Sequence, residues 1–278
     1  GDVYKRQTEE TAGRDPRMAQ TVLCPGYIAK GEESVTANDM TAMTGYEPIK
    51  FVSTAAHSGA SKGTSDWPLF RTAEVYLNYA EAKAELGTLT KDDLLISIDR
   101  IRDRAGMKGL DMAAANANPD PFLLACYPNV TKSENTGVIL EIRRERTIEL
   151  VMEGLRMWDM FRWKEGAQLV NETNPYYGIY FSGPGLYDMD GDGKNDLELY
   201  VDKQTSSPAD GLTVLRIGSD IILSDMAENR GYVVAWSTLK YTWNEERDYL
   251  WPIPADQRVL TGGLLTQNPG WTDSTDFD

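Results

Sequence analysis

The strongest constraint on the fold is a helical periodicity that begins sharply near residue 66. Asp66 is a suitable N-cap, Pro68 falls within the first turn of a helix that starts at Trp67, and Gly87 predicts its end. Apolar residues recur along this segment at intervals of three and four, which places them on one helical face. They are Leu69, Ala73, Tyr76, Ala80 and Ala84.

A second helix is predicted directly after the first. Thr90 occupies its N-cap, Asp93 stands at the capping-box position, and Gly106 closes it. Its apolar stripe consists of Leu94, Ile98, Ile101 and Ala105. Two antiparallel helices joined by a few residues form a hairpin of about tetratricopeptide length. Because one hairpin cannot bury its own apolar face, we expect partner helices.

A longer helical segment is predicted from about Val138 to Lys164, after a loop over residues 108–137 that contains three prolines. Gly154 divides or bends this helix, and large aromatic residues lie near its end. Most of its other positions are charged, which favours ion pairs with neighbouring helices.

The remainder of the chain alternates short extended runs with turns. We predict short strands at residues 46–52, 178–181 and 212–217. The tail from Asp248 to Trp271 contains Trp251-Pro252-Ile253-Pro254, which favours extended backbone and excludes a helix. The predicted fold class is therefore mostly α, with tetratricopeptide-like helical hairpins, a large loop-rich region and short strands.

Composition narrows the classes of ligand. With 28 basic and 43 acidic residues the net charge is −15, which disfavours phosphate backbones, so we expect no nucleic-acid partner. The two cysteines are expected to be unpaired thiols, and a single histidine excludes a typical zinc pattern. No apolar run is long enough for a membrane-spanning helix. Neutral ligands or cations suit this chain best.

Three segments together, in this order, resemble the SusD/RagB family. Pro68–Ala82 resembles the family's Arg-x-Ala-Glu-x-x-Leu-x-x-Ala-Glu-Ala helix. Ile142–Trp163 resembles its Arg-Arg-Glu-Arg…Glu-Leu…Glu-Gly…Arg-Trp segment. Tyr249–Pro254, followed by Gln267–Trp271, resembles the closing signature of the family. The resemblance covers about residues 46–271.

The resemblance implies a function in nutrient uptake and polysaccharide utilisation. Family members are lipoproteins on the bacterial cell surface, and they capture starch and other glycans, or in some members peptides, without catalysis. They lie over a SusC-like TonB-dependent transporter in the outer membrane. Family members are longer than this chain, so we expect it to be a C-terminal portion without the N-terminal hairpins and the lipid anchor.

The expected domain organisation follows from this resemblance. Residues 1–7 look like a non-native leader, residues 8–271 form a single SusD/RagB-like domain, and residues 272–278 are a tail. Besides glycan capture, three alternatives stay open: a peptide-capturing member of the family, a tetratricopeptide-type adaptor for a protein partner, and a glycosidase.

A glycosidase would need two carboxylates held across a substrate. Acidic residues recur every four positions on one face of the long helix, at Glu141, Glu145, Glu149 and Glu153. Interleaved arginines can neutralise them, so we interpret this pattern as structural ion pairs and predict no catalytic residue.

An acidic loop predicts a structural calcium site. Residues 188–196 read D-x-D-x-D-G-x-x-D, like the start of an EF-hand loop. The predicted oxygen ligands are Asp188, Asp190, Asp192, the carbonyl of Lys194, and Asp196. Leu199 stands where an EF-hand has its bidentate glutamate, and no EF-hand helices flank the loop. The alternative is a solvated acidic turn.

Aromatic residues outside the strong helices are the candidates for glycan binding. Flat rings stack on the apolar faces of pyranose rings, and a few polar groups fix the orientation of the ligand. The predicted ligand-binding residues are Tyr176, Tyr177, Tyr180, Trp236 and Trp243. For each of them, core packing or loop anchoring is the alternative interpretation.

Overall fold

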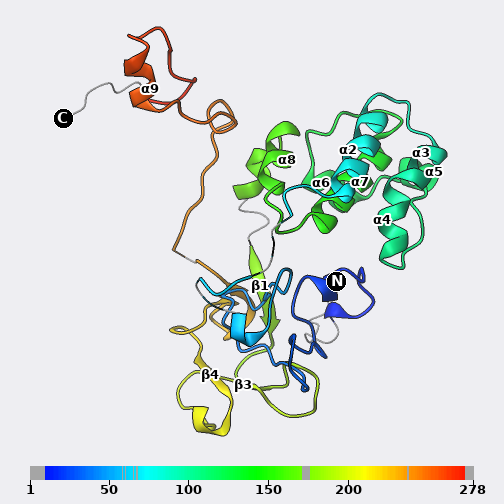
Figure 1. Cartoon of the computed structure of the whole chain (residues 1–278). Helices are drawn as coiled ribbons and strands as arrows, with labels where there is room; N and C mark the ends of the chain where they lie inside the picture. The colour runs from blue at the N-terminus through cyan, green and yellow to red at the C-terminus, as the bar shows by residue number, and fades with distance from the viewer. Residues whose placement is uncertain are drawn as a thin grey trace. The chain divides into compact units, whose positions relative to one another are not determined.

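The structure is a computed structural model that describes residues 10–272, except 58, 60, 65, 67, 171–175 and 237. The expected leader at residues 1–7 lies outside the described residues. The chain divides into two compact units, each built from three stretches of sequence (Figure 1). Unit 1 comprises Gly1–Val75, Leu95–Gly109 and Tyr176–Leu239, and unit 2 comprises Tyr76–Leu94, Leu110–Pro175 and Lys240–Asp278.

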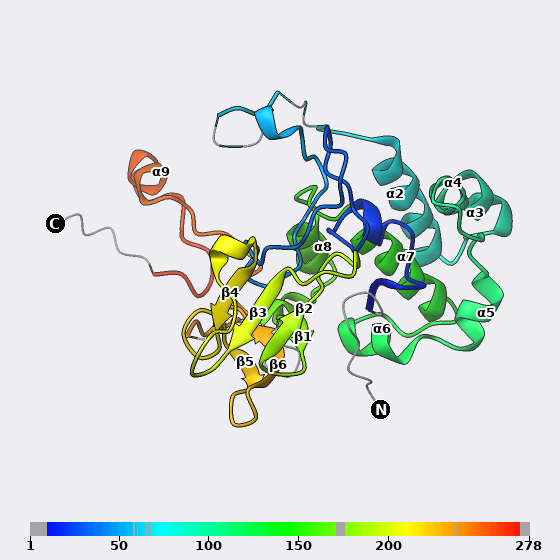
Figure 2. The ribbon, with the colours of Figure 1, turned by 90° about the horizontal axis from the view of Figure 1, so that it is seen from below.

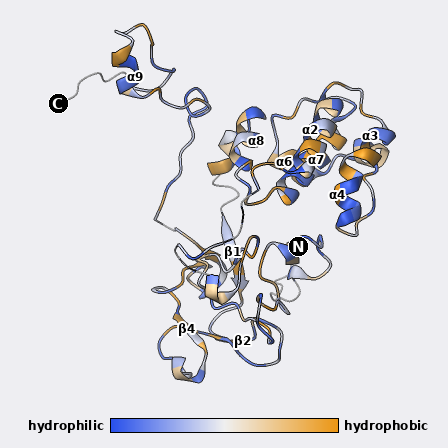
Figure 3. Ribbon diagram, in the orientation of Figure 1, coloured by the Kyte–Doolittle hydropathy of each residue, from blue (hydrophilic) through white to orange (hydrophobic). Residues whose placement is uncertain are grey.

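The fold is mostly helical with short strands in small sheets, as predicted. The α-helices are α2 (Thr72–Glu85), α3 (Lys91–Ile96), α4 (Ile98–Arg104), α5 (Met112–Ala117), α6 (Pro121–Cys126), α7 (Thr136–Glu149), α8 (Arg156–Arg162) and α9 (Ala255–Leu260). Short 3-10 helices are η1 (Met18–Gln20), η2 (Ala55–His57), η3 (Gly166–Val170) and η4 (Pro208–Asp210). The longer helices carry apolar and polar residues side by side (Figure 3), as helices with one buried face do. No helix in the described ranges is long and apolar enough to cross a membrane.

Helix α2 begins later than its sequence suggests. The expected start at Trp67 lies outside the described residues, and α2 itself begins at Thr72. Leu69 and Phe70, which precede it, are 82% and 88% exposed, so no packing favours a helix there. The predicted end is confirmed, because Gly87 has φ +68° and donates its N–H to Ala84 O.

The second helix of the predicted hairpin is two helices. The capping box is confirmed, because Thr90 N donates to Asp93 Oδ2 at 2.8 Å and Asp93 N donates to Thr90 Oγ1 at 3.2 Å. The prediction of one continuous helix is wrong, since the fully buried Ser97 has φ −126° and ψ −99° and separates α3 from α4. The predicted stripe residues Ile98 and Ile101 are buried.

Two predictions about irregular segments are also wrong. The predicted loop at residues 108–137 contains α5 and α6, which begin at side-chain caps on Asp111 and Asp120. Both helices pack on α7. The tail contains α9 directly after Pro254, because a proline only prevents helix on its N-terminal side. Helices of six residues show too little periodicity to be read from sequence.

The division of the long charged helix is confirmed. Helix α7 ends at Glu149, Gly154 has φ +78°, and α8 begins at Arg156. Gly137 lies in the first turn of α7, where an added Cβ would come within 1.9 Å of Ala115 O. Only glycine permits this close approach of α7 to α5.

Unit 1 contains two three-stranded sheets (Figure 2). The first has the order β1-β6-β5 and is antiparallel, with β1 at Tyr177–Phe181, β6 at Arg230–Val234 and β5 at Leu223–Asp225. The second has the order β2-β3-β4, with β2 at Gly185–Tyr187, β3 at Leu197–Tyr200 and β4 at Thr213–Arg216. Strand β3 pairs antiparallel with β2 and parallel with β4.

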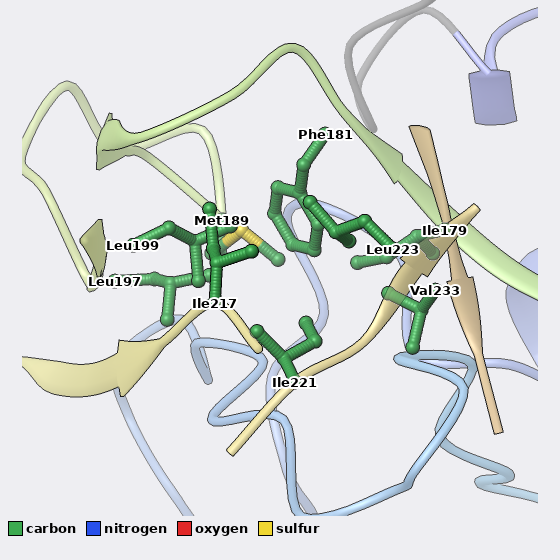
Figure 4. Close-up of a cluster of buried hydrophobic side chains, with 9 residues drawn as sticks. All are labelled: Ile179, Phe181, Met189, Leu197, Leu199, Ile217, Ile221, Leu223 and Val233. Atoms are coloured by element: carbon green, nitrogen blue, oxygen red, sulfur yellow. The ribbon is translucent and has the colours of Figure 1, made fainter. Parts of the chain in front are cut away.

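Apolar side chains from both sheets meet in one core (Figure 4). Its buried members are Ile179, Phe181, Met189, Leu197, Leu199, Ile217, Ile221, Leu223 and Val233. The strands predicted at residues 178–181 and 212–217 are confirmed within about one residue. The strand predicted at residues 46–52 is wrong: this segment contributes only a bridge between Val22 and Pro48.

Candidate functional site

Three tyrosines gather on the first sheet of unit 1. The ring of Tyr177 stacks on that of Tyr232, with centroids 5.5 Å apart and an interplanar angle of 4°. Tyr180 meets Tyr232 edge to face at 5.2 Å. Tyr177 and Tyr232 are 43% and 38% exposed. We call Tyr177, Tyr180 and Tyr232 the tyrosine platform.

An irregularity in β1 creates this platform. Residues three apart on a regular strand point to opposite faces of the sheet. The register between β1 and β6 shifts between Tyr177 and Tyr180, and both side chains consequently contact Tyr232. Tyr232 stands directly opposite Tyr180 in the pairing of β1 with β6.

The backbone beneath the platform is held by residues 44–46. Ile179 N donates to Thr44 O at 2.8 Å, and an added Cβ at Gly178 would lie 2.1 Å from the same oxygen. The hydroxyl of Tyr46 donates to Glu10, and burial together with this bond raises the pKa of Tyr46. Ile179 and Phe181 anchor the other face of β1 in the core.

The remaining predicted ligand-binding residues do not all join the platform. Tyr176 is 58% exposed and precedes β1, and Trp236 is 49% exposed and follows β6, both within unit 1. Trp243 belongs to unit 2, where it packs edge to face on Phe161 at 5.6 Å and on Tyr249 at 4.9 Å. The structure therefore describes Trp243 as a packing residue of unit 2.

Sequence reasoning missed Tyr232. It lies in a five-residue strand in which Gly231 and Val233 are buried and Tyr232 points outward. Such alternation predicts a half-buried strand with Tyr232 on its exposed face. It does not predict which other aromatic side chains Tyr232 contacts.

The acidic loop connects β2 to β3 and brings three of its carboxylates together. Ligand atoms of Asp188, Asp190 and Asp196 all lie within 4.8 Å of one another, so this triad can hold a metal ion. Calcium–oxygen distances of about 2.3–2.6 Å place two ligands of one ion up to about 5 Å apart, which this spacing satisfies. Burial raises the pKa of Asp196, and its neighbours Asp190 and Asp188 raise it further.

The two other predicted ligands are not part of this triad. Asp192 accepts hydrogen bonds from Lys194 N at 2.7 Å and from Lys194 Nζ at 3.1 Å. Asp188 accepts from Gly191 N at 2.7 Å and Gly193 N at 2.9 Å, which shapes the turn. Gly26 N donates to Asp190 O at 3.0 Å, so the loop is also tied to the N-terminal stretch of unit 1.

The charged residues of α7 and α8 form ion pairs, as predicted. Arg146 donates to both carboxylate oxygens of the buried Asp159, at 3.0 and 2.9 Å. Arg162 donates to Glu81, and Trp163 Nε1 donates to the same carboxylate at 2.6 Å. Glu145 and Glu149 are buried in α7. The carboxylates of Asp159 and Glu81 are thus ion-pair partners of arginines within unit 2.

The comparisons with known proteins agree with the motifs. The model of the SusD family matches residues 1–271, so this chain belongs to the SusD family, which is a family of non-catalytic binding proteins. No curated protein matches the chain.

Two solved structures from Bacteroides fragilis share the fold. A SusD-like protein has a TM-score of 0.55 and 23% identity over 94% of this chain. A SusD-like carbohydrate-binding protein has a TM-score of 0.52 and 20% identity over 93% of this chain. The matches cover 40% and 43% of those two proteins, so the chain spans well under half of their length.

Proposed function

We propose that this chain is the C-terminal portion of a cell-surface protein that binds oligosaccharides and delivers them to a SusC-like TonB-dependent transporter. The observation that carries the proposal is the exposed tyrosine platform on a chain of the SusD family. One of the two structural relatives is a SusD-like carbohydrate-binding protein, which supports the same ligand class. We also propose that a lipid anchor attaches the protein to the outer membrane.

The platform suits neutral sugars for two physical reasons. Its rings offer flat apolar surfaces to the C–H faces of pyranose rings, and tyrosine hydroxyls can exchange hydrogen bonds with sugar hydroxyls. The net charge of −15 disfavours anionic polymers. Tyr176 and Trp236, exposed in the same unit, are proposed as further contacts, and Trp243 of unit 2 is also a proposed contact.

Isothermal titration against a panel of plant, host and microbial glycans tests this proposal. We expect saturable binding of one glycan without cleavage, and at least about a tenfold loss of affinity, about 1.4 kcal/mol, in Tyr232→Ala and Tyr177→Ala. Tyr241→Ala is the matched control, because Tyr241 is a 52% exposed tyrosine of unit 2.

Other outcomes distinguish the alternatives. Binding that is equal in Tyr232→Ala and Tyr241→Ala would refute the platform as the site. Peptide binding without glycan binding would favour the peptide-capturing alternative. Binding of neither, with a folded protein partner bound instead, would favour a tetratricopeptide-type adaptor.

We also propose that the acidic loop binds Ca²⁺ as a structural ion. Asp188, Asp190 and Asp196 supply the first carboxylates. Asp192 and the Lys194 carbonyl would complete the shell after Asp192 leaves its bond to Lys194 Nζ. Calcium accepts six to eight oxygen ligands in flexible geometry, so a loop with mixed carboxylate and carbonyl donors suits it.

Thermal unfolding with added Ca²⁺ tests this site. An ion that binds only the folded state stabilises it by about 2.7 kcal/mol when the free ion concentration is a hundred times Kd. We expect Ca²⁺ to raise the Tm of the native chain and not that of Asp190→Asn. Asp202→Asn, an exposed aspartate of unit 1, is the matched control and should respond like the native chain. An equal response of all three chains would contradict the site.

A further inference from the structure

Two irregularities in strand pairing flank the central ring of the tyrosine platform. The pairing of β1 with β6 shifts its register between Tyr177 and Tyr180, and the pairing of β5 with β6 shifts between Leu223 and Asp225. Both shifts lie beside Tyr232, whose ring contacts those of Tyr177 and Tyr180. Such bulges re-aim side chains and are frequent next to functional sites. What holds the backbone at Tyr232 therefore decides how the platform is arranged.

The irregularity between β5 and β6 is an extra residue in β6. In β5 only Ser224 lies between the two paired residues, whereas in β6 Gly231 and Tyr232 lie between theirs. An extra residue in one strand interrupts the ladder of hydrogen bonds between the two strands. Gly231 has φ +117°, a backbone conformation that favours glycine. The bulge therefore lies directly before Tyr232.

The side chain of Ser224 supplies a hydrogen-bond acceptor where the ladder is interrupted. Tyr232 N donates to Ser224 Oγ at 3.0 Å. A side chain at residue 231 would take the space of this hydroxyl, because an added Cβ on Gly231 would overlap with Ser224 Oγ and lie 3.1 Å from Asp225 N. A glycine at 231 and a hydroxyl at 224 together hold the N–H of Tyr232.

Ser224 lies on the exposed face of β5, as Tyr232 does on β6. Leu223 and Val233 pair with each other and are buried, whereas Ser224 and Tyr232, the next residues toward the bulge, are exposed. Neighbouring residues on a strand point to opposite faces of the sheet. Ser224 consequently lies beside the platform and outside the core, so its replacement leaves no core cavity.

We propose that Ser224 is a positioning residue for the tyrosine platform. Its hydroxyl holds the backbone of Tyr232 at the bulge, and Tyr232 in turn holds the rings of Tyr177 and Tyr180. The effect of Ser224 on ligand affinity rests on the proposed glycan site, to which it adds a residue that acts through the platform. The hydroxyl is needed as an acceptor, so threonine can replace serine and alanine cannot.

Nuclear magnetic resonance of the ligand-free 278-residue chain tests the positioning without any glycan. In Ser224→Ala the amide of Tyr232 loses its acceptor, and we expect its hydrogen exchange to become about five times faster. Cross-peaks between the rings of Tyr177 and Tyr232, whose centroids are 5.5 Å apart, should weaken in the same variant. Ser224→Thr should keep the native exchange rate and cross-peaks. So should Ser34→Ala, the matched control at an exposed serine of unit 1.

Titration with the panel glycan that the native chain binds most tightly tests the effect on affinity. We expect Ser224→Ala to weaken binding about threefold to tenfold and Ser224→Thr to bind like the native chain. When Ser224→Ala is added to Tyr232→Ala, no further loss is expected, because a positioning residue acts only through the ring that it positions. A general loss of folding would instead lower binding in both backgrounds.

The outcomes separate this proposal from the proposed glycan site. Native exchange and native cross-peaks in a folded Ser224→Ala chain would overturn the positioning role, and so would unaltered affinity in a chain that binds glycan through Tyr232. Altered exchange and cross-peaks without binding of any glycan would support the positioning role and refute the glycan site. If Ser224→Ala does not fold, Ser224→Val takes its place, because valine has the shape of threonine without the hydroxyl.

Discussion

At the scale of single residues, one buried carboxylate organises the polar interior of unit 2. Glu81 lies on α2, is 6% exposed, and accepts hydrogen bonds from Arg162 and Trp163. Arg146 lies 3.7 Å from the same carboxylate. Glu81 is not among the apolar positions that the helical periodicity of the sequence predicts to be buried. Only the arginines of α7 and α8 make its burial favourable.

Loss of one of these arginines should be strongly destabilising. Arg146 bonds Asp159 and Asn78, and Arg146→Ala would remove both of its hydrogen bonds to the buried carboxylate of Asp159. We expect the free energy of unfolding to fall by about 3–5 kcal/mol, measured by urea denaturation. Arg144→Ala is the control, because Arg144 is 39% exposed where it pairs with Asp120. Its loss should be about 0–1 kcal/mol, and equal losses would refute a central role for Arg146.

Glu198 should make the stability of unit 1 sensitive to acid. Burial alone would raise its pKa, but hydrogen bonds from Thr205 and Ser206 outweigh burial and lower the pKa to about 2. The pKa of a glutamate side chain in an unfolded chain is about 4.3. The pKa of Glu198 is lower in the folded chain than in the unfolded chain. Ionised Glu198 therefore stabilises the fold fully above about pH 4.3, and this stabilisation is lost as the pH falls toward about 2.

The measurement is the Tm of the native chain and of Glu198→Gln between pH 6 and pH 2. The native Tm should exceed that of the variant at pH 6, and the difference should shrink as the pH falls through this window. A difference that stays constant with pH would contradict the assignment.

At the scale of elements, glycines decide where backbones approach each other closely. An added Cβ at Gly178 would lie 2.1 Å from Thr44 O, so β1 and residues 44–46 meet without room for a side chain. Nothing in a single sequence identifies this contact, because its two sides are more than 130 residues apart.

Gly178→Ala should loosen this contact. We expect a loss of about 1–3 kcal/mol in the free energy of unfolding and weaker glycan binding, since Tyr177 of the platform directly precedes Gly178. Gly63→Ala is the control, because an added Cβ there meets nothing within 4 Å. Its effect should stay within about 0.5 kcal/mol. Denaturation and titration of both variants check this, and an unaltered Gly178→Ala protein would contradict it.

At the scale of the whole molecule, the chain forms two units with different kinds of interior. Unit 1 contains the apolar core between its two sheets, the tyrosine platform and the acidic loop. Unit 2 buries apolar residues of α2 and α7, such as Leu77 and Ile139, together with ion pairs, and it contains an aromatic group of Phe161, Trp243 and Tyr249. Each unit draws on three stretches of the chain, so neither corresponds to one continuous segment.

The closing segment of the family motif folds onto itself within unit 2. Gln267 accepts from Ile253 N at 2.8 Å and donates to Ile253 O at 3.0 Å, and Asn268 donates to Trp251 O at 2.7 Å. The side chain of Trp251 is 58% exposed, so its ring is not buried among the described residues. The side chains of Gln267 and Asn268 join the two halves of this segment by hydrogen bonds to the backbone of Ile253 and Trp251.

The sequence by itself determined the features that depend on neighbouring residues. The capping box at Thr90, the helix end at Gly87 and the break at Gly154 follow from local backbone chemistry, and the acidic triad follows from residue spacing within one loop. Tertiary structure decided the burial of Glu81, the packing of α5 on α7, and the meeting of Tyr177 with Tyr232. These features depend on contacts between residues that are distant in sequence. Such contacts stabilise the fold only after those segments have packed together.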